Sequence, residues 1–228
     1  MKIAWGGNPK PTAWGQAVPP LGSVALSRGG VALSAQMRAA CQRGVFGVSV
    51  DSMKNYDFPD KFRELYDKAV ALYGQGQREA GKYFLAGEKT WLAANGITAQ
   101  HLYDYAEDQN NGGEPGYDKA LAIECVRRDY FLNVQRGKAS SAVLDEEKMP
   151  SKTEAARGIE WLPRIIPKAR AKLRGELPAS LMYSCGGDRR FFKEHDIFPP
   201  EFLSLVWRHE NDDQAIIDWV VNRSAGKK

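Results

Sequence analysis

The sequence predicts a mainly α-helical protein: a compact multi-helix domain with long loops, preceded by an irregular N-terminal extension. Two observations lead to this fold class. After residue 52, apolar residues recur at helical spacing in several segments, and alternating strand patterns are scarce. Residues 1–52 instead carry eight glycines, four prolines and no regular apolar period. We therefore expect residues 1–52 to be irregular or disordered and residues 53–228 to form one helical domain.

We expect a helix where apolar residues share one helical face and the segment begins at a capping residue and ends at a residue such as glycine. Thr98 is a good N-cap for the segment after it, and Asp212 or Asp213 can cap the last helix. Pro163 and Pro167 interrupt their segment, so a regular helix is expected only from Pro167. The expected helical segments are 59–74, 87–96, 99–108, 117–137, 167–174, 199–208 and 212–223, with a further helix starting at Asp188.

Two segments are expected to be irregular. Residues 108–117, DQNNGGEPGY, consist largely of turn-forming residues. Residues 138–157 are polar and form a long connection. A division of the domain into two subdomains, 53–137 and 158–228, joined by this connection, stays open.

Composition limits the classes of protein that fit. The formal net charge is +4, and the excess lies in residues 1–52, whereas residues 53–228 are neutral overall. Bulk charge therefore does not indicate a nucleic-acid binder. No apolar run is long enough for a membrane span. The three cysteines are far apart and show no zinc spacing, which favours reduced thiols in a cytoplasmic protein.

The extension has two further interpretations. It lacks the uninterrupted apolar core of a secretory signal. Its arginines and serines, and its near absence of acidic residues, are compatible with an organelle transit peptide. Apolar residues at helical spacing begin directly after Met53. We expect Met53 to be the natural start and residues 1–52 to be leader or upstream translation.

Four stretches resemble a known family. They are YDFPDKFRELYDKAVALY, LYDYAEDQNNGGEPGYDKALAIECVRRDYFLNVQRG, WLPRIIPKARAKLRGELPASLMYSCGGDRRFFKEHDI and EFLSLVWRHENDDQAIIDWV. The sequence resembles the uncharacterised bacterial family catalogued as domain of unknown function 5069, from about residue 56 to residue 224. The stretch from Leu162 to Leu177 is its most specific part. The resemblance implies a small soluble bacterial protein and assigns no catalytic residues.

The acidic loop after residue 103 is a candidate cation site. Calcium takes six to eight oxygen ligands from a flexible segment, and carboxylate and amide side chains around Gly112-Gly113 supply such atoms. The loop is not an EF-hand, because Lys119 stands where that motif requires Glu. A solvated turn, with Asp118 capping the next helix, is the alternative. The candidate metal ligands are Asp104, Asp108, Asn110, Glu114 and Asp118.

The stretch SCGGDRRFFKEHD, residues 184–196, is a candidate catalytic or anion site. Gly186 and Gly187 precede an expected helix start, where backbone N–H groups favour an anion, and Arg189 and Arg190 add charge. Cys185 at such a position can be a nucleophile with His195 as its base and Asp188 nearby. The competing interpretation is structural, because Asp188 as an N-cap occupies the same N–H donors.

Two groups of basic residues are further candidates for ligand binding. Arg127 and Arg128 can hold a carboxylate or phosphate if they line a pocket, or can form salt bridges on a helix face. A second group could bind RNA or an acidic ligand, or could complement the helix dipole. Its members are Arg164, Lys168, Arg170, Lys172 and Arg174.

Two functions remain open. The first is a hydrolase for a small ester, lactone or similar substrate, assisted by a cation such as calcium or by Cys185 and His195. The second is a non-enzymatic helical module that binds a small anionic ligand or a protein partner. The sequence lacks the P-loop, GxSxG, HExxH and Rossmann patterns, which argues against the commonest alternatives.

Overall fold

The computed structural model describes residues 55–226, and the predicted irregular extension at 1–52 lies outside them. The mainly α fold class is confirmed: the described residues form eight α-helices and one two-stranded hairpin. The elements are α2 (Phe58–Gly74), α3 (Ala86–Ala94), α4 (Ala99–Gly112), α5 (Tyr117–Asn133), β1 (Ala155–Ala156), β2 (Ile159–Glu160), α6 (Leu162–Arg174), α7 (Gly186–Glu194), α8 (Pro199–Arg208) and α9 (Asp213–Ala225), with short 3₁₀ turns at Ala80–Lys82 and Glu146–Lys148.

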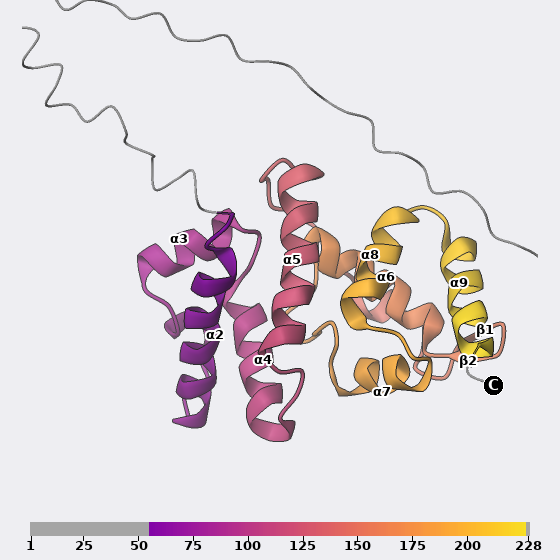
Figure 1. The fold of residues 1–228 in the computed structure, drawn as a ribbon, viewed down its shortest axis with the longest axis horizontal. Coiled ribbons are helices and arrows are strands. Elements are labelled where there is room, and N and C mark those ends of the chain that lie inside the picture. Colours follow the sequence, from indigo (N-terminus) through magenta and orange to yellow (C-terminus); the bar gives the residue numbers. More distant parts are fainter. Residues whose placement is uncertain (1–54, 227–228) are drawn as a thin grey trace, which may run out of the picture. The chain divides into compact units, whose positions relative to one another are not determined.

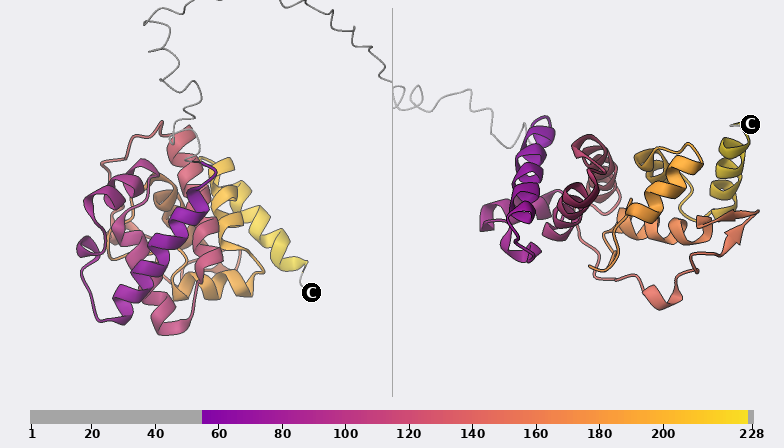
Figure 2. Two further views of the ribbon diagram at one scale, coloured as in Figure 1. Left: turned by 60° about the vertical axis from the view of Figure 1, so that its left-hand side comes forward. Right: turned by 90° about the horizontal axis from the view of Figure 1, so that it is seen from below.

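Helix α5 lies between two groups of helices, with α2, α3 and α4 on one side and α6 to α9 on the other (Figure 1). The view from below in Figure 2 shows the same order. The apolar side chains form two buried clusters that follow this arrangement. Ala120 of α5 belongs to the cluster of α2 to α4, whereas Ile123 and Tyr130 of the same helix belong to the cluster of α6 to α9.

Helix α4 is longer than its composition predicts, and the expected loop at 108–117 is wrong for its first half. The helix continues to Gly112, and Gly113 ends it in the left-handed conformation at φ 69°. Asn110 holds this last turn, because its Nδ2 donates to the carbonyl oxygens of Val70 on α2 and Ala106. Contacts with a neighbouring helix therefore override the local turn preference of Asn and Gly.

Helix α6 also starts earlier than expected, at Leu162 instead of Pro167. Pro163 occupies the first turn, where an N–H has no partner within the helix, and Pro167 lies inside the helix. Leu162, Ile165 and Ile166 are buried in the cluster of α6 to α9. The burial of this apolar face offsets the hydrogen bond that Pro167 cannot make.

The hairpin that precedes α6 lies at the end of the expected connection. Ala155 pairs with Glu160 and Ala156 with Ile159 in antiparallel register. The two residues between the strands, Arg157 and Gly158, both have positive φ, as a tight two-residue hairpin requires. The hairpin delivers Glu160 and Trp161 directly to the start of α6.

Candidate ligand-binding site

Helix α6 carries the basic residues that the sequence groups together, but each of them has a partner. Lys168 pairs with Asp188, Lys172 with Glu124, Arg170 with Asp213 and Arg174 with Glu210. Arg164 donates to the carbonyl oxygen of Pro150. Lys168 and Lys172 are also buried. This stretch therefore does not form the open basic surface that binding RNA or an acidic ligand would require.

The inner pair on α6 is Lys172 with Glu124 of α5, and both side chains are buried. Tyr105 of α4 donates its O–H to the same carboxylate at 2.8 Å. Burial is the largest single effect on Glu124 and raises its pKa, but the interactions with Lys172 and His101 together outweigh burial and hold this pKa well below its usual range. Burial lowers the pKa of Lys172, and Glu124 opposes that shift. The pair ties three helices together.

Arg127, a predicted ligand-binding residue, lies beside this pair. Its side chain is 2% exposed, and it extends over the Phe131 ring at 5.3 Å and toward Gly175. Arg128 points elsewhere: it donates to Asn95 and Asn55 and lies over the Phe58 ring. The two arginines therefore do not act together on one ligand, because their side chains point to different parts of the fold.

Asp188 organises the start of α7. Its fully buried carboxylate accepts hydrogen bonds from Lys168 Nζ at 2.8 Å, from the Ser184 backbone N–H at 2.9 Å and from Trp161 Nε1 at 3.0 Å. The helix begins at Gly186 with Cys185 as the N-cap residue. The expectation of Asp188 as the N-cap is therefore wrong. Asp188 lies in the first turn and accepts from the backbone N–H of Ser184, the residue before the N-cap.

Two of the residues bound by Asp188 have an uncommon backbone. Trp161 has φ 70° and Ser184 has φ 67°, both in the left-handed region that few residues other than glycine adopt. Each such residue costs on the order of 1 kcal/mol and persists only where its surroundings fix it. Here the Asp188 carboxylate bonds both, so the Trp161 indole is held in one position.

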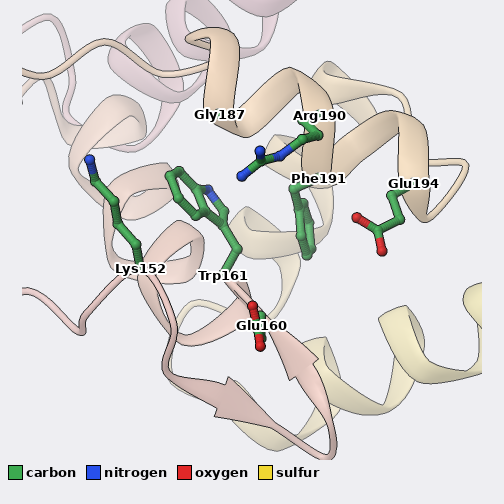
Figure 3. A pocket seen from close by; sticks show the side chains of 7 residues that line it. All are labelled: Lys152, Glu160, Trp161, Gly187, Arg190, Phe191 and Glu194. Atoms are coloured by element: carbon green, nitrogen blue, oxygen red, sulfur yellow. The ribbon is translucent and has the colours of Figure 1, made fainter.

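Trp161 forms one wall of a pocket of about 190 Å³, which we call the Trp161 pocket. It lies between the hairpin, the start of α6 and one side of α7 (Figure 3). Its lining residues are Lys152, Glu160, Trp161, Gly187, Arg190, Phe191 and Glu194.

Gly187 lets α7 approach the indole closely. A Cβ atom at this position would lie 2.6 Å from Cζ2 of Trp161 and 2.7 Å from Cη2. Of the predicted anion-site residues, Gly187 and Arg190 therefore do line one pocket, with Trp161 between α6 and α7. Gly186 lines a neighbouring open groove with Arg189 and Arg190.

Arg189, unlike Arg190, already pairs with acidic side chains within residues 55–226. Its guanidinium bonds Asp108 and the carbonyl oxygen of Ser184, and it lies 3.2 Å from Glu114. These bonds join α7 to α4 and to the turn that follows it.

The predicted catalytic residues are separated. Cys185 precedes α7 and His195 follows it, so nine helical residues, about 15 Å of helix, lie between them. His195 Nδ1 lies 2.9 Å from Ser224 Oγ, and its ring packs on Phe191. His195 is therefore wrongly placed to serve as the base for Cys185. The Lys168 ammonium lies 3.3 Å from the Cys185 sulfur.

The predicted metal ligands have other roles. Asp108 and Glu114 pair with Arg189, and Asn110 bonds the backbone of α2 and α4. Asp104 accepts from Gln100, and Asp118 lies in the first turn of α5 rather than capping it. Within residues 55–226 no group of three or more His, Cys, Asp or Glu side chains is arranged to hold a metal ion. The calcium hypothesis gains no support from this arrangement.

Sequence reasoning did not select Lys152, Glu160 or Trp161 as members of one site. They lie in or next to a short connection, and their partners on α7 are about 30 residues away in the chain. One signal was present: Trp161 directly precedes the PRxxPK segment and is the aromatic residue closest to it. Nothing in the spacing indicates that Gly187 packs against it.

Comparison with known protein families places the site within a matched region. The model of the family described as domain of unknown function (DUF5069) matches residues 146–228, a region that includes the whole Trp161 pocket. The resemblance proposed from the sequence is thus confirmed for this part of the chain. Neither the curated proteins nor the solved structures gave a match. None of the helices between residues 55 and 226 has the length and apolar character to cross a membrane.

Proposed function

We propose that this protein is a helical module that binds a small anionic ligand, a carboxylate or a phosphate, in the Trp161 pocket. One observation carries the proposal: Lys152 and Arg190 both line this pocket, and neither forms a salt bridge with an acidic residue in the described part of the chain. The other basic side chains around the site, Lys168 and Arg189, are paired.

The surroundings favour a bound anion over a solvated surface. Figure 3 shows the Arg190 guanidinium directed toward the Trp161 indole, with Phe191 beside it. The indole is held by Asp188 and so presents a preorganised apolar wall. A guanidinium next to such a wall binds an anion with less competition from water than it would on an open surface.

The test compares ligand-induced stabilisation in two variants at constant ionic strength. Inorganic phosphate and 3-phenylpropionate are titrated, and the melting temperature and the calorimetric affinity are measured. Arg190→Gln is expected to weaken binding at least tenfold, since a charge-assisted hydrogen bond contributes about 1.5–3 kcal/mol. Arg208→Gln, which removes an exposed charge on α8, should bind like the wild type. No binding of either anion to the wild type would refute the proposal.

A second candidate function, the ester or lactone hydrolase, is favoured by the contact between Cys185 and Lys168. The Lys168 ammonium lies 3.3 Å from the Cys185 sulfur, and Cys185 is the N-cap residue of α7. The thiolate would attack the acyl carbon, forming a thioester and releasing the alcohol, and water would then release the acid. In this version Lys168 replaces His195 as the activating group.

This candidate is tested with a chromogenic ester in single-turnover experiments. A thioester on Cys185, detected by intact mass, and its loss in Cys185→Ser are expected. Cys125→Ser is the matched control, because Cys125 is the other described cysteine and lies on α5. Equal ester turnover in Cys185→Ser and wild type would exclude the mechanism.

A further inference from the structure

The Trp161 pocket has charged groups of both signs in its lining. Lys152 and Arg190 are accompanied in the lining by Glu160 and Glu194. In Figure 3 the basic groups lie around the indole, whereas the Glu160 carboxylate lies below it and Glu194 lies beyond Phe191. The pocket therefore has a basic side and an acidic side.

Within the described part of the molecule, thirteen salt bridges pair a Lys or Arg with an Asp or Glu, and several of them link helices far apart in sequence. Arg190 and Glu160 line the same small pocket, yet neither takes part in any of them. In Figure 3 the Trp161 indole lies beside the Arg190 guanidinium and the Glu160 carboxylate lies below it, and the indole N–H is hydrogen-bonded to Asp188.

From this arrangement we infer that the ligand is a small zwitterion, an amino acid with an apolar side chain, whose carboxylate meets Arg190 and whose ammonium group meets Glu160. This inference rests on the proposed anion-binding function and specifies its ligand class. The apolar part of the ligand packs against Trp161 and Phe191, which supply the apolar surface of the lining.

The energetics favour a zwitterion over a simple anion. A carboxylate alone satisfies Arg190 but leaves the Glu160 carboxylate beside an added negative charge. An amine without a carboxylate pairs with Glu160 but adds a positive charge beside the Arg190 guanidinium. A ligand with both charges complements both sides, and each complementary pair in a partly desolvated site adds to affinity and to discrimination.

The test uses three ligands with one carbon skeleton: L-phenylalanine, 3-phenylpropionate, which lacks the amino group, and phenethylamine, which lacks the carboxylate. Calorimetry on the full chain is expected to show that L-phenylalanine binds at least tenfold more tightly than either of the other two. Glu160→Gln should abolish this preference for the amino group and leave the affinity for 3-phenylpropionate unchanged or higher. Glu154→Gln removes an exposed carboxylate that does not line the pocket, and it should retain the wild-type preference.

The outcomes separate the two proposals. If 3-phenylpropionate binds the wild type as tightly as L-phenylalanine, the zwitterion inference is refuted and anion binding stands. The same conclusion follows if Glu160→Gln retains the full preference for L-phenylalanine. If neither these ligands nor inorganic phosphate binds, the proposed function itself fails. Because Glu160 lies on a short surface strand, far-UV circular dichroism and the melting temperature of Glu160→Gln verify that the variant is folded.

Discussion

The shape of the Trp161 pocket depends on the absence of a Cβ atom at Gly187. Gly187 faces the edge of the indole, and its missing Cβ leaves the space that the ring occupies. The ring cannot retreat without breaking its hydrogen bond to Asp188, and Asp188 also holds the backbone of Ser184. A methyl group at Gly187 therefore disturbs the wall of the pocket and the start of α7 together.

We expect Gly187→Ala to weaken binding of 3-phenylpropionate at least tenfold and to destabilise the fold by about 1–3 kcal/mol, the usual cost of overpacking. Gly186→Ala is the matched control, because the nearest atom to its added Cβ is Arg189 Nη2 at 3.9 Å. That substitution should leave binding intact and stabilise the helix slightly, by up to about 1 kcal/mol. Urea unfolding and calorimetry measure both quantities. Equal behaviour of the two variants would contradict the role assigned to Gly187.

The buried pair of Lys172 and Glu124 permits a second prediction at this scale. Lys172→Met leaves a buried carboxylate without its counter-ion, which typically costs about 3–5 kcal/mol. The double variant Lys172→Met with Glu124→Leu removes both charges and should recover a large part of this loss. Chemical denaturation of the single and double variants gives the coupling energy. Additive losses would show that the pair is not coupled as the geometry indicates.

At the level of elements, capping residues predict helix ends more reliably than composition does. The Thr98 side chain accepts from the His101 N–H, and Asp212 accepts from the Ala215 N–H, as their positions in the sequence predict. These bonds are local, so the sequence contains them. The end of α4 and the start of α6 depend on side chains from other helices, and there the sequence-based boundaries are wrong.

Helix α6 supports a prediction about its internal proline. Pro167 lacks the N–H that would bond the carbonyl oxygen of Pro163. Pro163 lies in the first turn, where an N–H has no partner within the helix, so no helical hydrogen bond is lost there. We expect Pro167→Ala to raise the free energy of unfolding by about 1 kcal/mol or more, and Pro163→Ala to change it by less than half as much. Thermal and urea unfolding measure both. A loss of stability in Pro167→Ala would mean that packing of the ring outweighs the missing hydrogen bond.

Across the whole molecule, the class of fold could be predicted from the sequence, but the site could be predicted only in part. The glycine pair and Arg190 were selected because a helix start beside basic residues has a recognisable pattern. Lys152, Glu160 and Trp161 join them only through the hairpin before α6, whose geometry depends on left-handed backbone at Arg157 and Trp161. Such conformations are not encoded by residue type when the residue is not glycine.

The residues of the predicted cation site have other partners in the fold for a related reason. Asp108 and Glu114 were interpreted as loop ligands, but α4 extends beyond Asp108. Arg189 of α7 pairs with both carboxylates, and Lys193 also pairs with Glu114. Acidic residues in sequence cannot show which basic residue the fold brings to them. The same limit explains why Lys168 and Lys172, grouped as a basic surface, are buried in ion pairs.

The stability of the whole domain should depend on pH through Asp104. Burial raises the pKa of this carboxyl from 3.8 to about 7, although the hydrogen bond from Gln100 and the charge of Lys172 oppose the shift. The folded state thus holds the proton more strongly than the unfolded state does. This group's contribution therefore falls as the pH rises from about 4 to about 7, by up to about 1.4 kcal/mol per pH unit.

Asp104→Asn isolates this contribution, because the amide oxygen can still accept from Gln100 and carries no charge at any pH. Between pH 5 and pH 8 the variant should gain about 1–3 kcal/mol of stability relative to the wild type. Asp67→Asn on the exposed side of α2 removes the same charge and should show no such gain. Urea unfolding at a series of pH values measures the difference. If the wild type and Asp104→Asn keep a constant difference over this range, Asp104 is ionised in the folded protein at pH 5, and its burial does not control the acid dependence of the fold.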